Sequence, residues 1–223
     1  MTPLLIVFDL DGTIVDSRRD LADSVNGVIV EMGGTALPVD AIVRMVGEGA
    51  SVLVRRALAA ASLTDTPRAL ARFLEIYDAH LLDHTRPYPG MAEVVRAARR
   101  RARVALLTNK PRGPSIRILE AFGLLDLFDE VHGGDGPYGR KPDPSALLAL
   151  MDAAGAMPDH TWMVGDSAVD HQTALRAGAR CCLAGFGFGF ELFPHDRLTD
   201  RDWVAPSPEA LLAYIEQLPQ GRR

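Results

Sequence analysis

The sequence predicts an α/β fold in which a Rossmann-like parallel-sheet core carries an inserted all-helical domain. Short continuous apolar runs recur along the chain, each about the length of a strand that is buried on both faces. Segments with helical spacing lie between these runs, which is typical of βαβ units. One long stretch, residues 16–83, breaks this alternation because it contains only helical patterns.

The predicted strands and helices alternate through most of the chain. The first apolar run covers residues 4–8 and stops at a carboxylate, Asp9. Further strands are expected at 103–107, 130–132, 161–164 and 180–184. Helices are expected at 91–101, 114–122, 145–154 and 170–177. Because strands that alternate with helices usually lie parallel, we expect one parallel sheet covered by helices on both faces.

The insertion is predicted to contain three helices. Leu21, Val25, Val28 and Met32 repeat at helical spacing, and similar patterns follow at 50–61 and after Pro67. We therefore expect an α/β core formed by residues 1–15 and 84–223, and a helical domain formed by residues 16–83. Residues 87–90 are expected to form the linker that returns to the core, and residues 220–223 a frayed tail.

Composition excludes several classes of function. The 223 residues carry a formal charge of −5, so a basic face for nucleic acid is not expected. No apolar run approaches the ~18 residues that a membrane-spanning helix needs. The two cysteines, Cys181 and Cys182, are adjacent and cannot form a disulfide framework, so we expect a cytoplasmic protein. It is expected to be a monomer or a homodimer.

The strongest motif follows the first predicted strand. Asp9-Leu10-Asp11-Gly12-Thr13 places two carboxylates two residues apart where the strand ends. Ligands bind at this edge of an open α/β sheet. Gly12 allows the backbone to turn away sharply. A solvated turn would be the ordinary alternative, but the apolar strand before it favours a buried acidic site.

A second motif, Val164-Gly165-Asp166-Ser167, follows the strand expected at 161–164. Asp170 lies four residues after Asp166, so both carboxylates face the same way if a helix begins here. Ser167 and its neighbours could also act only as a helix N-cap. Beside the first motif, we expect the two strand ends to meet at one site.

Two weaker motifs complete the pattern. Thr108, Asn109 and Lys110 follow the strand at 103–107, where turn chemistry is the alternative interpretation. Lys141 precedes a proline, which favours an extended backbone, and it could also be an ordinary exposed loop lysine.

Together these four motifs, in this order, resemble the haloacid dehalogenase-like hydrolase superfamily. The resemblance implies that Asp9 is a nucleophile and that Asp11 is a general acid and base. An acid at residue 11 favours phosphoryl transfer, because the dehalogenase branch generally lacks it. The inserted helices correspond to a helical cap that covers the site and chooses the substrate, so the substrate is expected to be a small phosphorylated metabolite.

The resemblance also implies the remaining site residues. Phosphate binding is expected from Thr108, Asn109 and Lys141. A Mg²⁺ ion is expected to be held by Asp9, Asp166 and the backbone carbonyl of Asp11, which suits a hard cation that prefers oxygen ligands. Supporting roles are expected for Asp170, Gly12 and Ser167.

Several segments resemble bacterial phosphoglycolate phosphatases, namely residues 45–53, 133–135 and 185–190. This implies 2-phosphoglycolate as the substrate, and Arg18 or Arg44 could meet its carboxylate, although a solvated helix face is the ordinary role of such arginines. Related capped proteins leave two alternatives open: a phosphatase for another small or sugar phosphate such as N-acetylmuramic acid 6-phosphate, and a β-phosphoglucomutase-like phosphosugar mutase. Outside enzymes, a catalytically silent sensor of phosphorylated ligands on the same fold is the alternative.

Overall fold

The computed structural model describes residues 3–219, so the predicted tail at 220–223 lies outside the described residues. A sheet of six parallel strands forms the core, in the order β5-β4-β1-β6-β7-β8. The strands are β1 (Leu5–Phe8), β4 (Arg103–Leu107), β5 (Glu130–His132), β6 (Thr161–Gly165), β7 (Arg180–Ala184) and β8 (Asp202–Ala205). The predicted parallel α/β core is confirmed.

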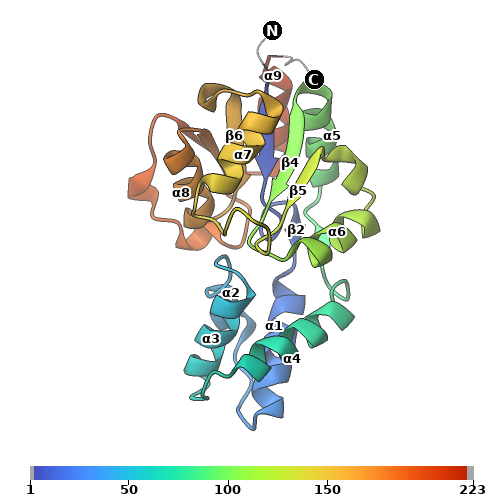
Figure 1. Ribbon diagram of the computed structural model, residues 1–223, viewed down its shortest axis with the longest axis vertical. Helices are drawn as coiled ribbons and strands as arrows, with labels where there is room; N and C mark the ends of the chain where they lie inside the picture. The colour runs from blue at the N-terminus through green and yellow to red at the C-terminus, as the bar shows by residue number, and fades with distance from the viewer. Residues whose placement is uncertain (1–2, 220–223) are drawn as a thin grey trace.

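Helices cover both faces of this sheet (Figure 1). They are α5 (Met91–Arg101), α6 (Arg112–Ala121), α7 (Ser145–Ala154), α8 (Ala168–Ala177) and α9 (Pro208–Gln217), with short 3₁₀ turns η1 (Leu125–Leu127), η2 (Pro158–His160), η3 (Phe190–Leu192) and η4 (His195–Arg197). Side chains alternate along β1: Ile6 and Phe8 join the apolar cluster with α5, α6 and α9, while Leu5 and Val7 join that with α7 and α8. This two-sided burial explains why the strand is a continuous apolar run.

Four helices follow β2 (Val15–Asp16) and precede β3 (Arg86–Pro87), and they form a separate layer below the sheet in Figure 1. They are α1 (Arg18–Glu31), α2 (Val39–Val43), α3 (Ala50–Ala60) and α4 (Pro67–Ala79). The predicted helical insertion is therefore present. The domain boundaries at 15/16 and 83/84 stay a prediction. No helix within residues 3–219 is long and apolar enough to cross a bilayer.

The two connections between the core and the inserted helices are tied together. β2 and β3 pair in an antiparallel manner. The buried carboxylate of Asp20, near the start of α1, accepts hydrogen bonds from the amides of His84 and Thr85 at 2.9 and 2.8 Å. The Thr85 hydroxyl donates a third bond at 2.7 Å. These bonds fix where the first inserted helix leaves the core.

The structure also contains elements that the sequence analysis did not predict. β8, α9 and the short helix α2 are absent from the expected set. β8 is a short edge strand that begins with a charged residue, Asp202, and is only partly buried, so it lacks the apolar run that marked the inner strands. α9 packs beside α5 and completes one face of the sheet.

Candidate active site

The candidate site lies at the point in the sheet where successive strands are added on opposite sides of β1. From β1 the chain adds β4 and β5 on one side, and later β6, β7 and β8 on the other. Ligands bind at such a switch point, at the carboxyl ends of the strands. A cavity of about 330 Å³ opens there between the strand ends and the inserted helices. Asp9, directly after β1, lies in its wall.

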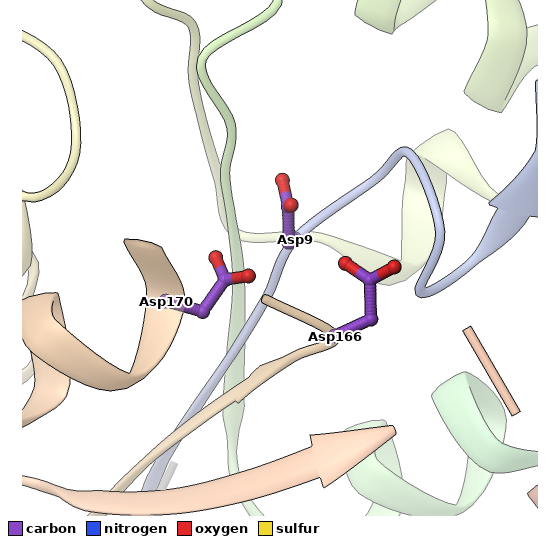
Figure 2. A group of neighbouring side chains, drawn as sticks. All are labelled: Asp9, Asp166 and Asp170. Atoms are coloured by element: carbon purple, nitrogen blue, oxygen red, sulfur yellow. The ribbon is translucent and has the colours of Figure 1, made fainter. Parts of the chain in front are cut away.

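Three carboxylates meet at this edge (Figure 2). Asp9 follows β1, Asp166 follows β6, and Asp170 comes from the first turn of α8. One oxygen from each lies within 4.8 Å of the others. β1 and β6 are neighbours in the sheet, so the two strand ends bring their acids together, as the spacing of the motifs predicts.

Lys141 holds two of these acids. Its Nζ lies 2.9 Å from Asp9 Oδ1 and 2.6 Å from Asp170 Oδ1, and its side chain is only 1% exposed. Burial alone would lower the pKa of Lys141, but Asp170 and Asp9 raise it to about 12, so the lysine stays charged. The predicted loop lysine is thus a buried cation at the site.

Burial has the largest influence on the pKa values of Asp9 and Asp166. Desolvation raises the pKa of Asp9 to about 6, against the attraction of Lys141. Desolvation and the nearby charges of Asp170 and Asp9 raise the pKa of Asp166 well above its ordinary value. A cluster of this kind is costly unless further positive charge reaches it.

Asp11 is not part of the cluster of three carboxylates, and a second lysine binds it. Lys110 Nζ lies 2.9 Å from both Oδ1 and Oδ2 of Asp11, and the Ser17 hydroxyl donates to Oδ1 at 2.5 Å. Lys110 also lies over the ring of Tyr77 from α4, 4.5 Å from its centroid. Asp11 is thereby fixed in the cavity wall with its side chain 14% exposed.

Glycines allow the backbone to approach Asp166 closely. Gly12 has φ +84°, and a Cβ there would lie 1.9 Å from Asp166 Oδ2. In the glycine-rich loop after β7, the Gly189 amide donates to Asp166 Oδ2 at 2.7 Å. A Cβ on Gly187 would meet the carbonyl oxygen of Gly12 at 2.2 Å. Larger residues at these positions would push the loop away from the acid.

Thr108 and Asn109 follow β4 on the opposite side of Asp9. The buried Thr108 hydroxyl accepts a bond from the Lys110 amide at 3.2 Å, which leaves its proton available to a ligand. The side-chain amide of Asn109 donates to the carbonyls of Gly47 and Lys141, both at 2.9 Å. Asn109 therefore links the inserted helices to the core, and a phosphate contact from it stays a prediction.

The structure gathers the predicted site residues in and around this one cavity, although their individual roles remain predictions. Ser167 precedes α8, and its amide and hydroxyl donate to Asp170 Oδ2 at 3.1 and 2.6 Å. Arg18 and Arg44 are exposed and do not line the cavity, and Arg18 instead pairs with Asp16 at 2.7 Å. They therefore retain their ordinary surface role.

Sequence reasoning assigned no role to four residues that shape the site: Ser17, Tyr77, Lys110 and Gly189. Lys110 belongs to the predicted motif after the strand at 103–107, but no role was expected for it. The alternation of glycine with phenylalanine at 185–190 is the signal that could have identified Gly189, because such glycines allow close approach of other groups.

The donor set fits a divalent cation. Asp9, Asp166 and Asp170 supply three buried carboxylates, whereas Lys141 brings one positive charge to them. Asp9 Oδ1 lies in an ion pair with Lys141, but it accepts no hydrogen bond of good geometry from residues 3–219. Carboxylate oxygens are the preferred ligands of hard cations. These acids could therefore hold a metal ion.

Comparison with known proteins agrees with this geometry. Residues 6–184 match the haloacid dehalogenase-like hydrolase family. The chain is 42% identical to a phosphoglycolate phosphatase of Rhodospirillum rubrum over 85% of this chain and 82% of that protein. It is 34% identical to one of Mesorhizobium japonicum over 98% and 94% of the two chains. A crystal structure of a predicted phosphoglycolate phosphatase from Haemophilus somnus superposes with a TM-score of 0.88 at 29% identity, covering 96% and 98%.

The chain therefore belongs to the haloacid dehalogenase-like hydrolase family. Within that family it is an enzyme similar to the bacterial phosphoglycolate phosphatases.

Proposed function

We propose that this chain is a Mg²⁺-dependent phosphomonoester hydrolase that acts on 2-phosphoglycolate through an aspartyl-phosphate on Asp9. The observation that carries the proposal is the placement of Asp9. It lies at the end of β1, in the wall of the cavity, beside a buried lysine and two further carboxylates.

The chemistry divides into two displacements at phosphorus. In the first, a carboxylate oxygen of Asp9 attacks the phosphorus, the bond to the ester oxygen breaks, and Asp11 donates a proton to the leaving alkoxide. In the second, Asp11 takes a proton from water while the water oxygen attacks the same phosphorus. The bond to Asp9 then breaks, and inorganic phosphate and the free carboxylate are released.

The neighbouring residues hold Asp11 in one place for both of these roles. Lys110 and Ser17 fix its carboxylate in the cavity wall, so one group can give and later take the proton at the same place. General acid–base help of this kind is typically worth ~10²–10⁴-fold in rate.

Positive charge must offset the approach of an anionic nucleophile to an anionic phosphate. Lys141 supplies one charge and is already 2.9 Å from Asp9. Thr108 offers a hydroxyl proton to a phosphoryl oxygen. Mg²⁺ would be held by Asp9, Asp166 and the backbone carbonyl of Asp11, and when bound it supplies further positive charge at the phosphoryl oxygens. The oxygens of Asp170 are engaged by Lys141 and Ser167, so we assign Asp170 to support of the site.

The choice of substrate rests on the relatives and on size. The relatives named above are phosphoglycolate phosphatases. The cavity of about 330 Å³ is near the lower end of the ~300–1,000 Å³ range of ligand pockets, which is ample for 2-phosphoglycolate.

A substrate panel tests the proposal. Phosphate release with Mg²⁺ should show the highest kcat/KM for 2-phosphoglycolate, above N-acetylmuramic acid 6-phosphate and β-glucose 1-phosphate. A clear preference for either sugar phosphate would overturn the substrate. Interconversion of phosphosugars without phosphate release would identify a mutase. Binding of these esters with no turnover would identify a sensor.

A further inference from the structure

Lysine is used at only two positions in this sequence. Lys110 and Lys141 are the only lysines among the 24 lysine and arginine residues, and both side chains are buried, at 4% and 1% exposed. Arginine fills every other cationic position. An ammonium is a compact charge with three donors, whereas a guanidinium is a planar fork. A chain that uses arginine elsewhere thus keeps the compact cation at two places in one site.

Lys110 has a donor beyond those that hold Asp11. Its Nζ reaches the two oxygens of Asp11 at 2.9 Å each, which accounts for two of its three N–H groups. Burial alone would lower the pKa of Lys110, but Asp11 and the polar end of Tyr77 raise it above its ordinary value, so the lysine is charged. The third N–H has only Tyr77 beside it among the described residues, so an acceptor that reaches both side chains can share it.

Tyr77 brings a second unsatisfied donor to the same place. Its side chain is 3% exposed, and its hydroxyl has no hydrogen-bond partner among the described residues. The ring stacks on Phe73, with centroids 5.6 Å apart and planes 5° apart, so its position is fixed. A buried hydroxyl without a partner is destabilising, and an acceptor on a bound ligand would satisfy it.

Lys110 is the only cationic side chain among the described residues that line the cavity. The wall beyond it, formed by the inserted helices, is mainly apolar, with Leu21, Val46, Leu53 and Phe73. A second anionic group on the substrate would therefore find Lys110 as its one cationic partner among the described residues that line the cavity. The exposed Arg18 and Arg44 do not reach the cavity.

We propose that Lys110 and Tyr77 form a subsite that binds the carboxylate of the substrate, and so select small phosphate monoesters that carry an acidic group. This inference rests on the proposed phosphatase function and adds a reason for its selectivity. Lys110 then bridges two carboxylates, that of Asp11 and that of the substrate. The Tyr77 hydroxyl donates to the second.

The test compares 2-phosphoglycolate with ethyl phosphate, which has the same two carbons but no carboxylate. The measured quantity is the ratio of the two kcat/KM values with Mg²⁺ present. We expect a ratio of at least ~10² for the unaltered protein, since a charge-assisted bond and a hydroxyl bond act together. Lys110→Met should lower this ratio by at least ~10-fold, mainly through KM for 2-phosphoglycolate. Tyr77→Phe, which keeps the stacked ring, should lower it by ~3–10-fold.

Matched control variants test whether the change in the ratio is specific to Lys110 and Tyr77. Arg44→Met removes an exposed cation, and Tyr138→Phe removes a hydroxyl outside the cavity, so both should keep the original ratio. Lys110→Arg should not restore the ratio, because the planar fork does not match a site built around a compact ammonium.

Distinct results overturn the two proposals. If Lys110→Met and Tyr77→Phe lower kcat/KM for both esters by equal factors, Lys110 only positions Asp11 and there is no carboxylate subsite. The same follows if the unaltered protein hydrolyses both esters equally well. If the unaltered protein releases phosphate from neither ester, the proposed function itself fails.

Discussion

The two walls of the cavity differ in kind. The core wall consists of strand ends and carries charge: Asp9, Asp11, Asp166 and Lys110. The wall formed by the inserted helices is mainly apolar, and its direct polar links to the core wall are few, such as the bond from Asn109 to Gly47. The reacting groups are thus fixed by a buried sheet, whereas the shape of the cavity is set by helices. Substitutions of the acids in the first wall should affect the chemistry, whereas substitutions in the second wall, and of Lys110 where it meets Tyr77, should affect selection of the substrate.

The largest effect is expected at the nucleophile. Asp9→Asn keeps the shape of the side chain but removes the attacking carboxylate, so kcat for phosphate release should fall by at least ~10⁴-fold. The measurement is steady-state phosphate release with 2-phosphoglycolate. Asp196→Asn, at an exposed carboxylate outside the cavity lining, should retain full activity. Retention of turnover by Asp9→Asn would show that the reaction does not depend on the carboxylate of Asp9.

The next largest effect is expected at Gly12, where the backbone passes close to the side chain of Asp166. Gly12 and Gly33 have almost the same φ, +84° and +83°, but only at Gly12 would a Cβ collide with Asp166. Both alanine variants should lose about 1–2 kcal/mol of stability from the left-handed backbone. Only Gly12→Ala should also lose activity, by ~10²-fold or more, because Asp166 must move.

Urea unfolding and kcat, measured for both variants, check this expectation. Equal activity in Gly12→Ala and Gly33→Ala would mean that the position of Asp166 is not critical.

Removal of the metal should destabilise the folded protein to an extent that depends on pH. Burial raises the pKa of Asp9 to about 6, so the folded, metal-free protein binds this proton more tightly than the unfolded chain does. Its stability should therefore decrease as pH rises from about 4 to about 6, and Mg²⁺ should restore it once the carboxylate is free. Mg²⁺ should raise Tm by a few degrees at about pH 7.5 and by much less at about pH 5.

Thermal unfolding with and without Mg²⁺ measures this difference. Asp166→Asn should abolish the increase in Tm, and Asp196→Asn should not. A Tm that rises equally at both pH values in all three proteins would place the ion outside the acidic cluster.

The smallest effects are expected where the two walls touch. Asn109→Ala removes the bond to Gly47 and the bond to the Lys141 carbonyl, so KM should rise by ~10-fold. Ser51→Ala removes an exposed contact with Arg140 and should change KM by less than ~2-fold. Steady-state kinetics with 2-phosphoglycolate measure both. If Ser51→Ala has the larger effect, the helices are held over the core by surface contacts and not by Asn109.

The sequence predicted the inner sheet and the acids because both leave local signals. A strand buried on two faces must be a continuous apolar run, and a carboxylate that ends such a run has few ordinary explanations. The edge strand β8 left no such signal, because it is short and half-buried. The helical wall was predicted as helices, but its residues at the cavity were not.

Lys110 shows why the contact between the two walls was harder to predict. Its importance depends on Tyr77, which lies 33 positions away along the chain on α4 and stacks against it only in the folded protein. No local pattern links the two residues. The one available signal was compositional, because the chain contains only two lysines.

Trapping the covalent intermediate tests the central claim most directly. The protein with Mg²⁺ is mixed with 2-phosphoglycolate, quenched in acid within the first turnover, and mapped by peptide mass spectrometry. We predict a phosphoryl group on Asp9, and none in Asp9→Asn. A phosphoryl group on another residue, or complete turnover in the unaltered protein with no phosphorylated peptide at any quench time, would contradict the account.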